Sequence, residues 1–199
     1  MSLAVFQTQL MRLITEPDFR DAVRADASAA LAAFELTPLE ASRLARIAAD
    51  PGVDVNRTLH KGFRLGKLRA LLPMTCQLLG NRRLAREVAA FWQTRPPSSF
   101  YYIPEAMEFC EFLAARHLRI KYLPEVLAFE RATLEIERAR IDEPAPQLVH
   151  FEHDPVPLLA ALAQGRAPRG LARRPAIAQG RRGADGHVEW RLAVLPSAV

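Results

Sequence analysis

The sequence predicts a mainly α-helical protein that ends in a small α+β, winged-helix-like domain with a C-terminal β-hairpin. Apolar residues recur at spacings of three and four through the first 140 residues, which is the period of helices with one buried side. The run Asp142-Glu143-Pro144-Ala145-Pro146 interrupts this pattern, and residues 187–195 then alternate as a half-buried strand does. We therefore expect an α-helical domain at residues 1–141 and a second domain at residues 147–199.

The N-terminal quarter is expected to form three helices. Apolar stripes predict the first over residues 3–14 and the second over residues 19–34. Thr37 is a suitable N-cap, Pro38 stands at the first helical position and Glu40 completes the spacing of a capping box. A third helix should therefore begin at Pro38.

The helix expected over residues 53–72 has two contrasting sides. One side is apolar and small, which predicts a packed face where its glycines let another backbone come close. Its residues are Val55, Leu59, Gly62, Phe63, Gly66 and Ala70. The opposite side has five cations and no acid, which predicts a contact surface. These cations are Arg57, Lys61, Arg64, Lys67 and Arg69.

The remaining elements are expected in a simple order. Pro73 ends or kinks the preceding helix, and Gly80 closes the short apolar helix that follows. Helices are then predicted over residues 83–93, 104–113 and 123–139, with residues 100–103 extended. A strand over 148–151, a helix over 157–164 and strands over 176–178 and 187–195 should complete the chain. In the last strand, alternation places Val188, Trp190 and Leu192 on one face and Arg191 on the other.

The composition leaves several classes of partner open. The formal net charge of +5 arises mostly from arginine, and it suits nucleic acid, a membrane surface or an acidic peptide. The two cysteines, Cys76 and Cys110, cannot form a disulfide framework or a four-thiol zinc site. No signal-type N-terminus and no apolar run of roughly 20 residues is present, so we expect a cytoplasmic protein with no membrane partner.

No pattern of catalytic or metal-binding residues is apparent. His150, Glu152, His153 and Asp154 are close in sequence, but a strand would point His150 and Glu152 away from His153. No HExxH motif, nucleophile elbow or glycine-rich phosphate loop accompanies them. We therefore expect no catalytic residue, no metal site and no cofactor in this chain.

Two binding functions remain for the C-terminal domain. Six arginines surround the expected hairpin and could contact DNA phosphates, as in a winged-helix regulator. They are Arg166, Arg169, Arg173, Arg174, Arg181 and Arg182. The helix over 157–164, however, has no polar face to read bases, so nucleic acid is not the expected partner. If the last strand is a sheet edge, it could instead accept an extended peptide.

Short motifs follow one another in a fixed order from residue 56 to residue 130. They are Asn56-Arg57, Leu71-Leu72-Pro73, Leu78-Leu79-Gly80, Phe91-Trp92, Arg95-Pro96-Pro97-Ser98-Ser99-Phe100-Tyr101, Glu105-Ala106, Phe109, Phe112-Leu113, Tyr122-Leu123 and Phe129-Glu130. This ordered series resembles the accessory proteins that partner TIM-barrel iron enzymes in modified-peptide (RiPP) biosynthesis. Within that family the sequence is most similar to members from methanobactin biosynthesis. One departure is Val55, where more general members carry a tyrosine before the Asn/Arg pair.

The resemblance implies a non-catalytic subunit of a heterodimer. The partner would be an iron-dependent TIM-barrel oxygenase, which holds the iron and converts cysteines of a precursor peptide to oxazolone and thioamide groups. This chain would recognise the leader of that precursor, whose product chelates copper. The expected partner-binding residues are Asn56, Arg57, Lys61, Arg64, Phe100, Tyr101 and Tyr102. The expected peptide-binding residues are Arg173, Arg174, Val188, Trp190, Arg191 and Leu192.

Overall fold

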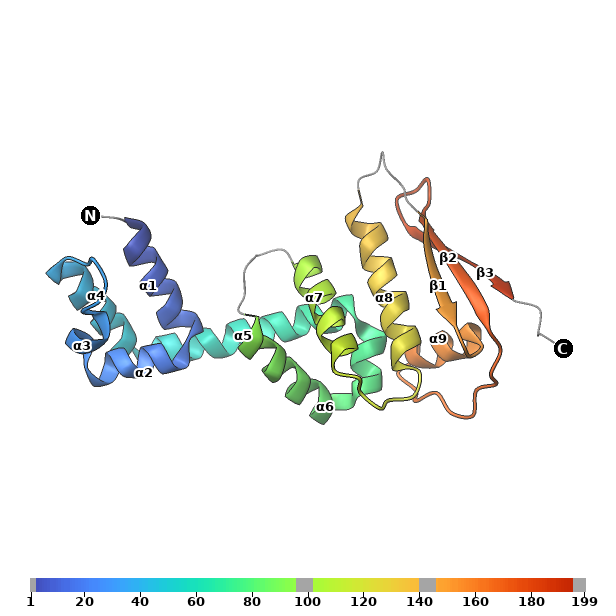
Figure 1. Cartoon of the computed structure of the whole chain (residues 1–199), viewed down its shortest axis with the longest axis horizontal. Coiled ribbons are helices and arrows are strands. Elements are labelled where there is room, and N and C mark those ends of the chain that lie inside the picture. Colours follow the sequence, from blue (N-terminus) through green and yellow to red (C-terminus); the bar gives the residue numbers. More distant parts are fainter. Residues whose placement is uncertain (1–2, 96–101, 140–145, 195–199) are drawn as a thin grey trace. The chain divides into compact units, whose positions relative to one another are not determined.

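The chain is mainly helical and ends in a three-stranded antiparallel sheet, as the sequence predicts (Figure 1). The fold is that of a computed structural model, which describes residues 3–95, 102–139 and 146–194, without the side chains of residues 56, 57, 193 and 194. The helices are α1 (Leu3–Thr15), α2 (Pro17–Ala25), α3 (Ala27–Leu31), α4 (Pro38–Ala49), α5 (Pro51–Leu71), α6 (Pro73–Thr94), α7 (Tyr102–Ala115), α8 (Leu123–Arg138) and α9 (Pro155–Ala163). The strands are β1 (Gln147–Phe151), β2 (Ala176–Arg182) and β3 (Val188–Val194).

The described residues form two compact units, Met1–Arg64 and Leu65–Val199. In the first unit, α1 to α4 bury a core of leucines, Val23 and Ala48. The capping box at α4 is confirmed, because the Thr37 N–H donates to Glu40 Oε2 over 2.8 Å and the Glu40 N–H donates to Thr37 Oγ1 over 3.3 Å. The single helix predicted over residues 19–34 is wrong. Asp26 divides it, since its side chain accepts the Ala29 N–H and starts α3.

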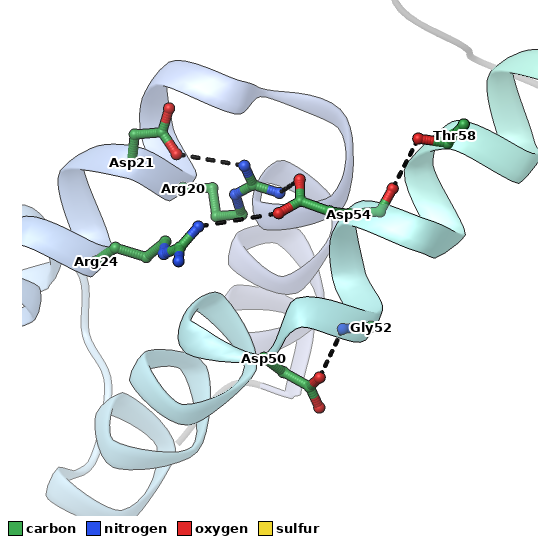
Figure 2. Close-up of polar contacts among 7 residues, drawn as sticks. All are labelled: Arg20, Asp21, Arg24, Asp50, Gly52, Asp54 and Thr58. Atoms are coloured by element: carbon green, nitrogen blue, oxygen red, sulfur yellow. Dashed lines mark hydrogen bonds and ion pairs between the residues drawn. The ribbon is translucent and has the colours of Figure 1, made fainter.

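The first unit also contains a buried cation (Figure 2). The Arg20 side chain on α2 is only 6% exposed, and its guanidinium contacts the Asp54 carboxylate on α5. Asp21 lies 3.3 Å from the same guanidinium, and Arg24 lies 3.9 Å from Asp54. The hydrogen bond that Arg20 donates to Asp54 is the main cause that raises the pKa of Arg20 above its ordinary value. These ion pairs connect α2 to the first turn of α5.

The structure contradicts the prediction that the apolar, small side of α5 is packed. Val55, Leu59 and Phe63, predicted to be packed, are 60%, 67% and 53% exposed. A Cβ atom added at Gly62 or Gly66 would meet no atom within 4 Å. Arg64, predicted to lie on the contact surface, is buried. The helical period shows which residues share a side, but it cannot show which side the rest of the chain covers.

The second unit has a helical core and a sheet core, and α8 contributes to both. Leu123, Leu127 and Leu134 of α8 belong to the helical core with α6 and α7. Val126 and Ala132 of the same helix belong to the sheet core with β1, β2 and α9. Figure 1 accordingly shows α8 between α7 and β1. The predicted domains, 1–141 and 147–199, therefore differ from the compact units, because α8 packs on the sheet. Most of the predicted linker, residues 142–145, lies outside the described part of the chain.

Local signals within the second unit have mixed outcomes. Gly80 separates two halves of α6 with a φ of 66°, which agrees with its predicted role as a helix end. The extended conformation predicted for residues 100–103 is wrong for Tyr102 and Ile103, which lie in α7 because Pro104 suits its first turn. Residues 100 and 101 lie outside the described part. The helix predicted from residue 157 begins at Pro155, with Asp154 accepting the Val156 N–H.

The sheet has the strand order β1-β2-β3 and a regular register. Val149 of β1 is opposite Ala178 of β2, which is opposite Leu192 of β3. The face that contains these three residues packs toward α8 and α9, where Val149 and Ala178 are buried. The predicted β-hairpin is thereby confirmed, with a third strand on its other side.

Gly180 is a position where we expect a substitution to destabilise the sheet. A Cβ atom there would lie 2.7 Å from the Trp190 ring and 2.8 Å from Ile136 Cδ1. Gly180→Ala should lower the free energy of unfolding by about 1–3 kcal/mol, because the crowded ring and helix must shift. Urea unfolding measures this loss. Gly66→Ala is the control, since Gly66 has open surroundings and no positive φ, and an equal loss in both variants would contradict the overpacking explanation.

Candidate functional site

The outer edge of β3 is the candidate site for peptide binding. In the described residues β3 pairs with β2 alone. The Gly183 N–H donates to the His187 carbonyl over 2.7 Å at the hairpin end, which sets the alternation of hydrogen-bonded pairs between β2 and β3. By this alternation the N–H and C=O groups of Val188, Trp190 and Leu192 point away from β2. Three of the predicted peptide-binding residues thus present backbone groups at a sheet edge.

Their side chains lie on the face predicted from the sequence. Trp190 packs against Phe129 of α8 with ring centroids 4.7 Å apart, so its ring is part of the sheet core. Leu192 is 44% exposed at the edge of the same face. Arg191 is exposed on the opposite face. A strand added to β3 could therefore bury Leu192, whereas Trp190 already has a structural role.

The arginines of the C-terminal module mostly have intramolecular partners. Arg173 pairs with Glu152 over 3.3 Å and Arg174 with Asp154 over 3.5 Å. These four side chains are partly or largely exposed, so the pairs contribute little stability and can exchange partners. Arg181 pairs with Glu189 over 3.3 Å, and Arg182 donates to the carbonyls of Ile136 and Glu137. Much of the positive charge predicted around the hairpin is therefore balanced locally.

Two of the residues considered as metal ligands, Glu152 and His153, connect the end of β1 to α8. Glu125 Oε2 accepts the N–H groups of Glu152 and His153 over 3.0 and 3.1 Å. Its other oxygen lies 2.8 Å from His153 Nδ1. Sequence reasoning missed Glu125, because its partners lie 27 residues away along the chain. Among the described residues there is no group of three or more His, Cys, Asp or Glu side chains that could hold a metal ion.

The predicted partner-binding residues fall in both compact units. Lys61 on α5 is exposed and Arg64 is buried. Tyr102, the first residue of α7, is partly buried, and Lys67 Nζ lies 5.4 Å from its ring centroid. Phe100, Tyr101 and the side chains of Asn56 and Arg57 lie outside the described part. Sequence reasoning interpreted Val55 and Leu59 as core residues, but their exposure makes them candidates for contact with another protein.

The two cysteines are expected to be chemically inert in the folded chain. Burial raises the pKa of both Cys76 and Cys110 to about 12, and the nearby carboxylate of Glu130 adds to the effect. At pH 8 neither thiol should react with a thiol-specific disulfide reagent within minutes, whereas both should react in denaturant. Rapid reaction of either thiol with the native chain would show that the helical core opens readily.

Comparisons with known proteins give no match. No protein-family model, no curated protein and no solved structure matches the chain. In the described part of the chain, none of the helices is long and apolar enough to cross a membrane.

Proposed function

We propose that this chain is the non-catalytic subunit of a heterodimer with an iron-dependent TIM-barrel oxygenase, and that it recognises the leader of a precursor peptide. The partner holds the iron and converts cysteines of the precursor to oxazolone and thioamide groups with dioxygen, as in methanobactin biosynthesis. The proposal rests on the resemblance of the ordered sequence motifs. The free edge of β3 is the structural observation that carries it.

The β3 edge suits an extended leader peptide. Strand addition gives affinity through backbone hydrogen bonds and specificity through alternate side chains. Inward side chains of an added strand would cover Leu192, which is 44% exposed. Acidic residues of the leader would be attracted to Arg173 and Arg174, whose present partners are exposed or partly exposed carboxylates. Arg191 lies on the outer face of the same strand.

The exposed side of α5 suits the enzyme partner. Val55 and Leu59 are one helical turn apart, and each exposes 60% or more of its surface. Lys61 is exposed on the same helix and adds a positive charge. Apolar side chains exposed together on a folded protein often mark a contact surface. We therefore assign the partner contact to α5, together with the predicted residues Asn56 and Arg57.

A matched pair of variants tests leader recognition at β3. Leu192→Pro removes a backbone N–H that points away from β2, while Leu192→Ala keeps that N–H and removes most of the side chain. Leader affinity, measured by fluorescence anisotropy with the precursor encoded beside this chain, should fall roughly tenfold or more with Leu192→Pro and less with Leu192→Ala. Equal affinity in the wild type and Leu192→Pro would rule out strand addition at β3.

Co-expression with the neighbouring barrel enzyme tests the heterodimer. A stable one-to-one complex that contains iron should form only when both chains are present. Leu59→Asp should weaken this complex, whereas Leu39→Asp, at a leucine of α4 that is 61% exposed, should leave it intact. If this chain purifies alone and monodisperse in the presence of the enzyme, the proposal fails.

The alternative is a winged-helix-like DNA-binding regulator. It requires cations that are available for phosphates, yet five of the six arginines near the hairpin have intramolecular partners. A regulator should bind any duplex with an affinity that falls steeply with salt. A peptide-recognition subunit should show no duplex retention at about 0.15 M salt. A mobility-shift assay at low and physiological salt separates the two.

A further inference from the structure

The edge of the sheet opposite β3 borders a groove that neither function above uses. The groove has a volume of about 520 Å³ and is lined by α7, α8 and β1. Figure 1 shows α8 between α7 and β1, and residues of all three elements line the groove. We call this space the β1 groove. Its lining includes Leu113, Leu127, Ala114, Ala128 and Ala132.

Small side chains create the space. Ala114 on α7 and Ala128 on α8 are both exposed, and longer side chains at these positions would fill the groove. Leu113 and Leu127 give the deeper part an apolar surface. The groove therefore suits apolar side chains of moderate size, whose burial supplies most of the affinity in such sites.

The backbone of β1 faces the groove with unused hydrogen-bonding groups. Within the described residues β1 pairs with β2 alone. By the alternation that starts at the Gly183–His187 hydrogen bond, Ala176, Ala178 and Gly180 of β2 direct their backbone N–H and C=O groups toward β1. Leu148 and His150 of β1 are not opposite these residues, so their N–H and C=O groups point away from the sheet. The Glu152 N–H, next in this alternation, confirms the direction because it donates to Glu125 of α8.

An extended chain would satisfy both features at once. Its backbone would pair with Leu148 and His150, and every second side chain would point over α8 into the groove. Leu148 is 60% exposed and would be covered by the side chains on the outer face. A helix could not supply these hydrogen bonds, because its own N–H and C=O groups are paired internally.

Charge at one end of the groove adds a preference. His117 lines this end, and the turn between α7 and α8 also contains Arg119 and Lys121, both exposed. Lys121 Nζ lies 4.8 Å from the centroid of the Tyr122 ring. A ligand with an acidic residue at this end would complement these charges.

We propose that the β1 groove binds an extended segment of the precursor peptide as a fourth strand, with apolar side chains at alternate positions and an acidic residue beside Arg119 and Lys121. This proposal rests on the proposed function in one respect, which is that the precursor peptide is the source of the segment. The preference for an alternating extended peptide follows from the groove itself. The two edges of the sheet would then hold separate stretches of peptide.

A peptide library tests the groove without knowledge of the precursor. Random dodecapeptides displayed on phage are selected against the full chain, and the binding site of the enriched peptides is mapped by amide hydrogen exchange. We expect enriched sequences with apolar residues at alternate positions, at least one acid, and exchange at Leu148 and His150 slowed roughly tenfold or more. Enrichment that maps only to β3, or no enrichment, would overturn the proposal.

Matched variants make the test specific. Ala128→Trp fills the groove from an exposed position on α8 and should weaken the selected peptides roughly tenfold or more. Ala163→Trp makes the same change at an exposed position on α9 and should leave their affinity unchanged. Leu148→Pro removes an outward N–H, and Leu148→Ala is its control. Similar affinity for the wild type, Ala128→Trp and Leu148→Pro would exclude the groove.

A further experiment separates an error in the β1 groove proposal from an error in the proposed function. In parallel with the peptide selection, the wild-type chain is co-expressed with the barrel enzyme and tested with the leader at β3. If the iron complex and leader binding persist while no peptide occupies the β1 groove, only the groove assignment is lost. If selected peptides bind the groove but no complex forms, the groove stands and the enzyme partnership fails.

Discussion

Glu130→Ala is expected to lower the free energy of unfolding of the second unit by about 2–4 kcal/mol. Glu130 of α8 is buried, and its two oxygens accept the N–H groups of Met74 and Thr75 over 2.7 and 2.8 Å. These are among the first N–H groups of α6, which have no partner within their own helix. Alanine would leave both donors unsatisfied, one in the partly buried Met74 and one in the buried Thr75. Urea unfolding followed by the fluorescence of Trp92 and Trp190, the two tryptophans of the chain, measures the loss.

The control for this prediction lies on the same helix. Glu135 pairs with Arg131 over 3.0 Å at a partly exposed position, so Glu135→Ala should cost less than about 1 kcal/mol. Glu130→Gln keeps an acceptor for one of the two N–H groups and should give an intermediate loss. Equal effects of Glu130→Ala and Glu135→Ala would show that the carboxylate does not cap α6.

The same carboxyl predicts a pH dependence of stability. Burial raises the pKa of Glu130 above its ordinary value of 4.5, although the hydrogen bonds from Thr75 and Met74 oppose the shift. The folded chain therefore holds this proton more tightly than the unfolded chain does. As the pH rises from about 4.5 through the raised pKa, this group should lower the free energy of unfolding. Glu130→Gln lacks this titrating group. The difference in free energy of unfolding between the wild type and Glu130→Gln should therefore shrink as the pH rises.

Elements set by local chemistry could be predicted from the sequence. The capping box of Thr37 and Glu40 favours a helix start at Pro38, because it satisfies N–H groups within one turn. Gly80 adopts a φ of 66° with a ψ of 162°, a combination that is essentially restricted to glycine. The alternation of Trp190 and Leu192 likewise gives the correct face of β3. Each of these signals depends on a few neighbouring residues.

Features that depend on distant partners could not be predicted in this way. The apolar residues of α5 share one side, but only the fold shows that Val55 and Leu59 remain exposed. The composition change at residues 142–146 predicts a domain boundary, but it gives no sign that α8 has apolar residues in two cores. The β1 groove depends on Ala114 and Ala128, and an alanine on a helix gives no sign that it will border a sheet edge.

Loss of the Arg20 ion pair is expected to destabilise the first unit by about 1–3 kcal/mol. Asp54→Ala would leave the Arg20 guanidinium, whose side chain is 6% exposed, with only the more exposed Asp21 as a partner (Figure 2). A buried charge that loses its main partner costs more than an exposed pair contributes. Arg20→Met, which keeps the aliphatic length and removes the charge, should be less harmful than Asp54→Ala.

Two spectroscopic signals can locate this effect. Both tryptophans belong to the second unit, so their fluorescence follows that unit, whereas circular dichroism at 222 nm follows helices in both. Asp54→Ala should lower the midpoint seen by circular dichroism more than the midpoint seen by fluorescence, and Glu130→Ala should shift the fluorescence midpoint strongly.

Arg24→Ala is the control, because Arg24 is 45% exposed and lies 3.9 Å from Asp54. If Arg24→Ala and Asp54→Ala have equal effects, burial of Arg20 is not what makes the Asp54 contact important. If Asp54→Ala shifts both signals equally, the two units unfold together, because α5 continues from one into the other.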